Sequence, residues 1–319
     1  MPVRLWLAGW AIVKWLPEPV AHGFGRIGGA VAYRRDTRRR GNLRANLRQV
    51  VGPEVSDADL ERLVRRGFAS YAQYWIEAFR LERLTARQVR KRFHFEGVEA
   101  LERCWAEGRG VVAAVPHMGN WDVGGAFLAA RGIPAATVAE RLKPVELFNR
   151  FVRYREALGL EIVPSDDGPK AIRRLVECLR EGKTVALVAD RDLGGRGIPV
   201  TLFGRRAFMP GGPASLALRT GSALIPAAVY QVRPGRWRAL TRGAIEITPT
   251  GDMRADTAEL TRKLAAEFEY LIGLAPEQWH MLVPYWPVDP APGVPAPGGP
   301  LTDSGSADAG RLGSEEART

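Results

Sequence analysis

A histidine and an aspartate lie five positions apart in the segment VVAAVPHMGNWDVGG, residues 111–125. A run of small and β-branched apolar residues ends at Pro116, and His117, Asn120 and Asp122 follow it. This pattern predicts a buried strand that delivers His117 into a loop, and a helix capped by Asn120 with Asp122 in its first turn. A carboxylate that accepts a hydrogen bond from Nδ1 of His117 would leave Nε2 as a general base.

A second group of charged residues occurs in the segment LVADRDLGGRG, where Asp190 and Asp192 flank Arg191 directly after another predicted strand. Ligands of α/β proteins collect where parallel strands end. We therefore expect His117 and this group at the same edge of a sheet, while Asp122 is the local candidate for a partner of the histidine.

Metal and serine chemistry are poorly supported by the sequence. A catalytic zinc usually has two or three histidine or cysteine ligands, and His117 has carboxylates as its neighbours. Cys104 and Cys178 stand far apart and form no metal or redox motif. The G-x-S-x-G motif of serine hydrolases is missing from the sequence. We expect no metal and no cofactor.

Strands and helices alternate along most of the chain, which predicts an α/β fold: a single domain with a central, mostly parallel or mixed β-sheet flanked by helices. Strands are predicted at 110–116, 135–140, 161–164, 183–190, 198–204 and over ALIPAAVYQV, followed by a hairpin-like RWRALTRGAIEI. Helices are predicted near 57–80, 97–107, 120–131, 143–159, 214–221 and 254–272, and over PKAIRRLVECLREG.

The N-terminus indicates interfacial amphipathic helices. Trp6, Trp10 and Trp15 lie among aliphatic residues in a run too short to span a bilayer, and an arginine-dense segment, 33–48, follows. The chain has 46 Lys+Arg against 35 Asp+Glu, a net charge of +11. An anionic membrane surface fits this pattern, although a helix packed on the body with a solvated basic face is the alternative. Nucleic acid is not expected, because no nucleic-acid-binding motif accompanies the charge.

The predicted organisation has three parts. Residues 1–50 hold the membrane-associating helices and the basic run, and residues 51–287 form the α/β domain in one continuous fold with them. Residues 288–319 are rich in Pro, Gly, Ala and Ser without periodicity, which predicts a disordered tail.

Several blocks of the sequence resemble known acyltransferases. PHMGNWD resembles the H-x4-D/E block of membrane-associated lysophospholipid and lipid A acyltransferases. AERLKP, DRDLGGRGIPVTLFGRRAFMPGGPASLALRTGSALIP and PEQWHMLVPYWP are similar to the phosphatidylinositol mannoside acyltransferases of actinobacteria. The resemblance covers about residues 3–287. It implies transfer of a fatty acyl group, such as palmitoyl, from acyl-CoA to a mannose hydroxyl, by a peripheral protein at the cytoplasmic face of the plasma membrane.

The resemblance also implies roles for individual residues. His117 matches the catalytic histidine, and Asp190 falls where this branch commonly has the glutamate partner of that histidine. Glu140 and Arg155 match a charged pair at the border of the active site. Aspartate is one methylene shorter than glutamate, so Asp122, Asp190 and Asp192 all remain candidates for the partner.

Other residues are suited to binding the substrates. Arginine matches phosphate geometry, and Arg150, Arg153, Arg155, Arg205 and Arg206 are candidates for the phosphates of CoA and phosphoinositol. Gly211 and Gly212 precede a predicted helix, whose free N–H groups suit an anion or oxyanion. Arg191 and Asp192 are included as candidate substrate contacts.

Three alternatives stay open at this point. The acceptor can be another glycolipid or a lysophospholipid, the protein can bind lipids without catalysis, or it can be a metal-dependent hydrolase.

Overall fold

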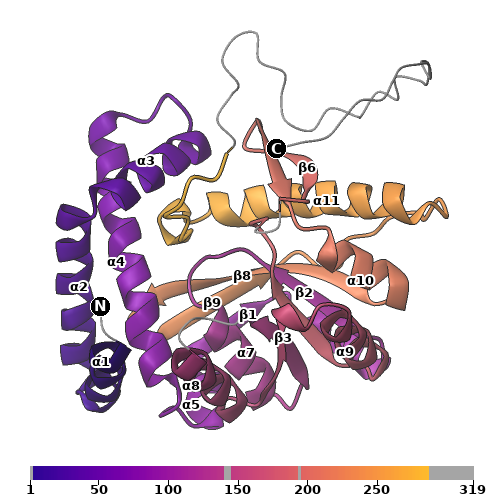
Figure 1. The fold of residues 1–319 in the computed structure, drawn as a ribbon, viewed down its shortest axis with the longest axis horizontal. Helices are drawn as coiled ribbons and strands as arrows, with labels where there is room; N and C mark the ends of the chain where they lie inside the picture. The colour runs from indigo at the N-terminus through magenta and orange to yellow at the C-terminus, as the bar shows by residue number, and fades with distance from the viewer. Residues whose placement is uncertain (1–2, 140–144, 193–194, 287–319) are drawn as a thin grey trace, which may run out of the picture. The chain divides into compact units, whose positions relative to one another are not determined.

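A seven-stranded sheet forms the centre of the computed structural model, which describes residues 3–139, 145–192 and 195–286 (Figure 1). Across the sheet the strands follow the order β1 (Phe93–Glu96), β9 (Arg236–Thr241), β8 (Ala223–Arg233), β2 (Val111–Val115), β5 (Thr184–Val188), β3 (Ala135–Ala139) and β4 (Leu160–Pro164). The strands from β8 to β4 run parallel, β9 is antiparallel to β8, and β1 is parallel to β9. The predicted α/β fold with a mostly parallel or mixed sheet is confirmed.

Helices cover both faces of the sheet, because alternate side chains of each strand point to opposite faces. Val112 and Ala114 of β2 face a core that includes α9 (Pro169–Arg180), α10 (Gly212–Thr220) and α11 (Met253–Gly273). Val111 and Ala113 point to the other face. That face is covered by α5 (Ala86–Arg92), α6 (Val98–Ala106), α7 (Trp121–Ala130) and α8 (Val145–Ala157).

The N-terminal helices form a layer beside the sheet (Figure 1). They are α1 (Val3–Trp15), α2 (Glu18–Arg35), α3 (Thr37–Val51) and α4 (Asp57–Leu81). The glycines of α2 allow a close approach to α4, since an added Cβ at Gly29 would lie 2.9 Å from Cα of Ala69. In the described part of the chain, we find no helix with the length and apolar character needed to cross a bilayer.

Two tryptophans of the N-terminal helix, Trp10 and Trp15, lie in different environments. Trp10 is 1% exposed and its ring stacks on Phe79 with centroids 4.8 Å apart. Trp15, by contrast, is 70% exposed. Trp10 therefore attaches α1 to the body of the protein, while Trp15 is available to a membrane.

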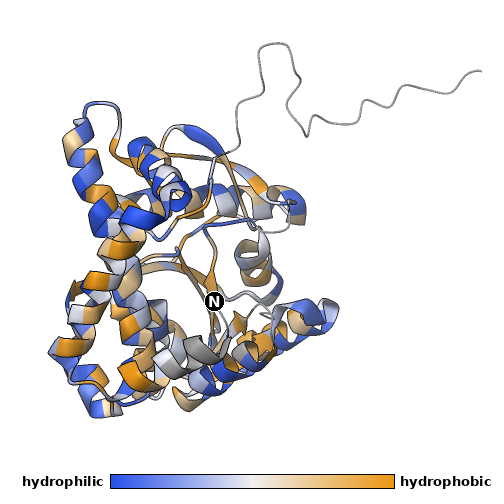
Figure 2. Ribbon diagram, turned by 60° about the vertical axis from the view of Figure 1, so that its left-hand side comes forward, coloured by the Kyte–Doolittle hydropathy of each residue, from blue (hydrophilic) through white to orange (hydrophobic). Residues whose placement is uncertain are grey.

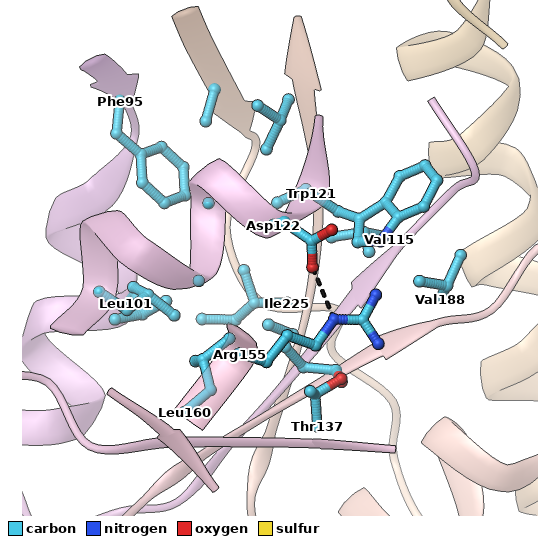
Figure 3. Close-up of a pocket in the computed structure, with 18 of the residues that line it drawn as sticks. Phe95, Leu101, Val115, Trp121, Asp122, Thr137, Arg155, Leu160, Val188 and Ile225 are labelled. Atoms are coloured by element: carbon cyan, nitrogen blue, oxygen red, sulfur yellow. Dashed lines mark hydrogen bonds and ion pairs between the residues drawn. The ribbon is translucent and has the colours of Figure 1, made fainter. Parts of the chain in front are cut away.

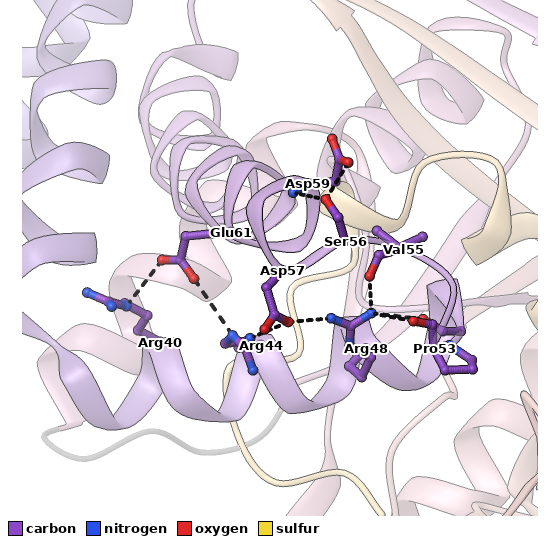
Figure 4. Close-up of polar contacts among 10 residues, drawn as sticks. Arg40, Arg44, Arg48, Pro53, Val55, Ser56, Asp57, Asp59 and Glu61 are labelled. Carbon is purple, nitrogen blue, oxygen red and sulfur yellow. Dashed lines mark hydrogen bonds and ion pairs between the residues drawn. The ribbon is translucent and has the colours of Figure 1, made fainter.

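Part of the arginine-dense segment is neutralised within the protein (Figure 4). Arg44 and Arg48 of α3 both contact Asp57 at the start of α4, at 2.7 and 2.6 Å. Arg40 lies 3.4 Å from Glu61, one turn further along α4. These pairs connect α3 to α4, so only part of the basic run that the sequence assigned to a membrane is free to act on one.

A small antiparallel hairpin stands apart from the main sheet: β6 (Ile198–Leu202) and β7 (Arg205–Met209). Its turn consists of Phe203 and Gly204, both with positive φ. Gln49 of α3 donates to the Phe203 carbonyl at 2.7 Å, and the Phe203 amide donates to Glu269 of α11. The sequence predicted only β6, because Phe-Gly is not a typical hairpin dipeptide and its conformation depends on these distant contacts.

Two other segments differ from the prediction. The segment 86–96, to which no element was assigned, forms α5 and the edge strand β1. The hairpin expected within RWRALTRGAIEI is instead made by β8 and β9, and residues 242–252 form no strand. The 3-10 helices are Ser165–Asp167 and Pro276–Gln278. The predicted tail lies outside the described residues, and the division of the chain at residue 50 stays a prediction.

Candidate active site

The turn after β2 holds His117 in a defined conformation. Asn120 begins α7 by accepting a hydrogen bond from the Val123 amide at 3.3 Å. Gly119 has a φ of +55°, and an added Cβ would lie 1.6 Å from the carbonyl oxygen of Val229. Because no other residue fits this approach, the turn packs directly on β8.

Asp190 is the carboxylate that pairs with His117. The parallel register of β2 and β5 places Val115 beside Val188, so the residues that follow each strand lie side by side at one edge of the sheet. Nδ1 of His117 lies 2.5 Å from Oδ1 of Asp190, and the His117 amide donates to Oδ2 at 3.0 Å. This two-point contact fixes the ring and the carboxylate together.

Two aromatic residues hold Asp190 from the C-terminal segment. Trp279 donates its indole N–H to Oδ2 at 2.7 Å, and Tyr285 donates its hydroxyl to the Asp190 backbone carbonyl at 2.7 Å. Burial opposes the charge of this fully buried carboxylate, but His117 and Trp279 outweigh burial and hold its pKa below the ordinary value. An ionised Asp190 only accepts, so we place the proton of His117 on Nδ1 and the lone pair on Nε2.

Asp122, one of the three candidate partners of His117, has different partners in the structure. The buried carboxylate of Asp122 accepts from Nε of Arg155 at 2.8 Å and from the hydroxyl of Tyr74 at 3.1 Å. Burial opposes the charge on Arg155, yet Asp122 raises the pKa of this guanidinium above its ordinary value. The Arg155 guanidinium therefore stays charged, and its contact with Asp122 joins α7 to α8.

The segment 278–281 clamps the turn through backbone contacts. The Gly119 amide donates to the Gln278 carbonyl at 3.0 Å, and the His280 amide donates to the His117 carbonyl at 2.7 Å. Between them, Met118 and Trp279 form an isolated antiparallel bridge. Residues near the end of the described chain thus complete a site that begins near its middle.

His280 lies near His117 but has a different character. Its ring is buried, with Nε2 3.0 Å from Oγ of Ser70 and centroids 5.3 and 5.8 Å from Tyr71 and Tyr74. Burial, with the nearby His117, lowers the pKa of His280 to about 3. His280 is neutral and a weak base at physiological pH, which leaves His117 as the candidate general base.

An apolar cavity of about 90 Å³ lies between the sheet and α7 and begins beside the His117–Asp190 pair. Val115 and Val188, each two residues before a member of the pair, line it together with Trp121, whose ring centroid is 5.6 Å from that of His117. Small and aliphatic side chains from the strands line the rest, among them Ala113, Thr137, Ala186, Ile225, Ala227, Val229 and Ala239.

The two ends of the cavity differ (Figure 3). Trp121 and Val188 lie at the end near the histidine, and Phe95 and Leu101 lie at the opposite end. The Asp122–Arg155 pair lies between the ends and is the charged part of the wall.

In the loop after β5, the carboxylate of Asp192 forms a hydrogen bond within the loop. Asp192 accepts the Gly197 amide at 2.7 Å, so this third candidate partner of His117 stabilises its own loop. Arg191 is partly buried directly after Asp190. Glu140, the expected partner of Arg155, lies outside the described residues.

The remaining candidates for binding lie on the hairpin and on α10. Arg205 and Arg206 begin β7, and the Arg206 guanidinium lies 5.2 Å from the ring centroid of Phe208. Gly211 caps α10 and Gly212 is its first residue.

The direction of α10 places its N-terminus near the site. The helix ends just before Ala223, which pairs with Val111 at the start of β2. Its first turn therefore lies toward the opposite edge of the sheet, where β2 ends and His117 follows.

The contacts of Trp279 and Tyr285 with Asp190, and of Tyr74 with Asp122, were not predicted from the sequence. The segment PEQWHMLVPYWP drew attention through its resemblance to acyltransferases, but its contact with Asp190 spans 89 positions of the sequence. No local pattern encodes such a contact.

The pair has the wrong composition for a metal centre. No three His, Cys, Asp or Glu side chains gather as potential ligands within the three ranges that the structure describes. Both oxygens of Asp190 already face N–H donors.

A partly exposed strand-end histidine with a buried carboxylate partner, beside an apolar cavity in an α/β fold, fits an acyltransferase-type site. The model of the bacterial lipid A biosynthesis acyltransferase family matches residues 2–287, and the chain belongs to that family. The resemblance found in the sequence motifs is confirmed.

Its relatives include two that are named phosphatidylinositol mannoside acyltransferase. The one from Mycolicibacterium smegmatis is 39% identical over 283 residues, which cover 88% of this chain and 90% of the relative. One from Mycobacterium tuberculosis is 37% identical over 294 residues, or 88% and 87% of the two chains. A lipid A biosynthesis acyltransferase of Haemophilus influenzae is 25% identical over 261 residues, or 80% and 77%.

Proposed function

We propose that this protein transfers a fatty acyl group, such as palmitoyl, from acyl-CoA to a mannose hydroxyl of a phosphatidylinositol mannoside. The two mycobacterial relatives bear this acceptor in their names and align with most of the chain. The observation that carries the proposal is the His117–Asp190 pair beside an apolar cavity, which brings a general base next to a space for an acyl chain.

In the proposed reaction, Nε2 of His117 removes the proton of the acceptor hydroxyl while its oxygen attacks the thioester carbonyl carbon. Asp190 orients the ring and offsets the positive charge that it gains. The tetrahedral intermediate then releases the thiolate of CoA by breaking the C–S bond, and the proton on Nε2 passes to that sulfur. A thioester is already activated, so we propose that neither a metal nor another cofactor takes part.

We assign the cavity to the acyl chain. Its wall is formed mainly by alanines, glycines and aliphatic side chains, and burial of apolar surface is worth about 25 cal/mol per Å². The chain would enter past Trp121 and extend toward Phe95 and Leu101 (Figure 3). Its thioester would then remain at the edge of the sheet, within reach of His117.

Charged and polar groups around this edge supply further interactions. We propose that the first N–H groups of α10, at Gly212, stabilise the tetrahedral oxyanion, because helix N-termini favour negative charge. Arg191, Arg205 and Arg206 are proposed contacts for the phosphates of CoA or of the acceptor headgroup. Arg155, with Asp122 and with Glu140 as the sequence resemblance implies, would border the acceptor.

We propose that the protein works as a peripheral protein at the cytoplasmic face of the plasma membrane, where acyl-CoA is available. Large apolar side chains are exposed on the N-terminal layer, which includes both orange and blue residues in Figure 2. They are Ile12, Trp15, Val20, Phe24, Ile27 and Val31. Apolar side chains beside arginines suit an anionic bilayer surface.

A single assay tests the proposal. Purified protein is incubated with palmitoyl-CoA and a panel of phosphatidylinositol mannosides, other glycolipids and lysophospholipids, and the release of free CoA is measured. We expect release that depends on a mannosylated acceptor, persists in chelator and disappears in His117→Ala. Release of CoA only with another acceptor would mean that this acceptor, and not a mannoside, is the substrate. Release of CoA without any acceptor would indicate a thioesterase. Loss of CoA release in chelator would favour a metal-dependent hydrolase, and the absence of release under all conditions would favour a lipid-binding protein.

A further inference from the structure

The carboxylate of Glu77, near the C-terminal end of α4, is 4% exposed and has no part in the proposed reaction. Its Oε2 accepts from Nδ2 of Asn120 at 3.0 Å and from the indole N–H of Trp237 at 2.7 Å. Its Oε1 accepts from the side-chain amide of Gln231 and lies 3.5 Å from the Gly235 amide. A buried carboxylate is costly unless its oxygens are hydrogen-bonded, and here four N–H groups converge on it.

Two routes lead from this carboxylate to the residues that follow His117. The first is direct, through Asn120, which is buried and caps α7. The second passes through Gln231, whose backbone N–H and C=O are both bonded by the side-chain amide of Gln278, at 2.8 and 3.0 Å. The backbone carbonyl of Gln278 in turn accepts the Gly119 amide at 3.0 Å. The routes end on the adjacent residues Gly119 and Asn120 and close a ring of hydrogen bonds around the turn.

We infer that Glu77 is a positioning residue for acyl transfer, which fixes the His117 turn from α4 through Asn120 and Gln278. The inference rests on the proposed function, since it assigns Glu77 to keeping Nε2 of His117 aligned with the acceptor hydroxyl. Misplacement of a reacting group by about 1 Å can cost about 10²-fold in rate. Loss of the ring of hydrogen bonds should therefore appear in kcat.

The same helix offers a matched control. Gln73, one turn before Glu77, is also buried and pairs with His22: its Oε1 lies 2.7 Å from Nδ1 of His22, and its amide donates to the His22 carbonyl at 2.8 Å. These bonds join α4 to α2 and do not reach the His117 turn. Gln73→Leu removes a comparable buried network without touching the ring around Gly119 and Asn120.

The experiment compares Glu77→Gln, Glu77→Leu and Gln73→Leu in the full chain. Glu77→Gln keeps the side-chain volume but turns one acceptor oxygen into a donor that faces other N–H groups. The readouts are kcat with palmitoyl-CoA, the unfolding temperature, and the deshielded proton resonance of Nδ1 of His117. The short bond to Asp190 produces that resonance, which His117→Ala identifies by abolishing it.

We expect Glu77→Gln to lower kcat by about 10- to 10²-fold and to shift or broaden the resonance. Gln73→Leu should lower the unfolding temperature. Its kcat should stay within twofold of the wild type, and its resonance should not shift. The inference is overturned if Glu77→Gln lowers only the unfolding temperature, as the control does. If Glu77→Leu fails to fold, Glu77→Gln decides. If the wild type transfers no acyl group to any acceptor, the proposed function fails, and the resonance alone still tests the positioning role.

Discussion

Trp279 donates its indole N–H to the same Asp190 oxygen that accepts the His117 amide, at 2.7 Å. The other oxygen of Asp190 faces the imidazole, so the indole settles which way the carboxylate points. Hydrogen bonds to an ionised group are about twice as strong as neutral ones. Trp279 therefore helps to keep Asp190 charged in a place where burial alone would favour the neutral acid.

Replacement of Trp279 by phenylalanine should move the pH dependence of stability. The carboxylate loses one donor, so the pKa of Asp190 rises toward its ordinary value. Asp190 stabilises the fold above its unfolded pKa, and this contribution is lost as pH falls through the folded pKa. Acid unfolding of Trp279→Phe should therefore begin at a higher pH than in the wild type.

Trp286 provides the control for this substitution. Its ring is buried and packs edge-to-face against Trp279 with centroids 6.0 Å apart, but its indole N–H has no acceptor among the described residues. Trp286→Phe makes the same chemical change without altering Asp190. If the two variants begin to unfold at the same acidic pH, the role given to Trp279 is contradicted.

Asp190→Asn should lower kcat by about 10²–10⁴-fold, the range that a positioned general base supplies. The side-chain amide of asparagine is neutral, so neither its oxygen nor its NH2 group offsets the positive charge that His117 gains. Asp192→Asn, two residues later, alters the loop contact with Gly197 instead of the His117 pair and should retain activity within a few fold. Steady-state CoA release measures both variants, and a larger loss in Asp192→Asn would return that residue to the list of partners.

The sequence predicted the position of His117 correctly because strand, turn and helix cap are local signals. VVAAV is a buried strand and Asn120 is a good helix cap. The placement of Asp190 at the end of another strand followed in the same way. Which carboxylate meets the histidine depends on the pairing of β2 with β5, and pairing between distant strands leaves no local trace.

The contacts that hold the site were outside the reach of sequence reasoning. Asp122 had the spacing of a partner for His117, but Arg155 of α8 approaches it from 33 positions away. Glu77 lies in the helix predicted over 57–80, and no role was predicted for it, because its partners come from α7, β8 and β9. Buried polar residues in long helices are the signal that could have directed attention to it.

The Asp122–Arg155 pair should contribute strongly to stability as a pair, because the exposed fractions of its side chains are 3% and 16%. Arg155→Met leaves the buried Asp122 with the hydrogen bond from the Tyr74 hydroxyl but without its cation. Removal of one partner of such a pair costs about 3–5 kcal/mol. Urea unfolding of Arg155→Met, Asp122→Leu and the double variant measures this. The double variant should be less destabilised than the sum of the single ones, and simple additivity would show that the pair is not coupled.

A larger side chain in the cavity should change the acyl-chain preference. Ala113 lines the cavity two residues before Val115 and lies beside Ala186. Ala113→Leu fills the space beyond this point, so kcat/KM for palmitoyl-CoA should fall at least about tenfold, equivalent to about 1.4 kcal/mol of lost apolar burial. Short-chain acyl-CoA serves as the internal control and should be used as well as by the wild type. A uniform loss for all chain lengths would place the acyl chain elsewhere.

Membrane binding should depend on the exposed stripe of α2. Phe24 and Ile27 are 56% and 63% exposed, and their spacing of three places them on one face of the helix. Full burial of such a side chain is worth about 1.5–3 kcal/mol, so the double variant Phe24→Ser/Ile27→Ser should bind anionic vesicles at least about tenfold more weakly in a sedimentation assay. Ile172→Ser on α9, where the side chain is 52% exposed, removes a similar apolar surface away from this layer. Equal loss in the control would mean that the bilayer does not contact α2, whereas selective loss that is enhanced by salt would show that apolar contacts and arginines act together.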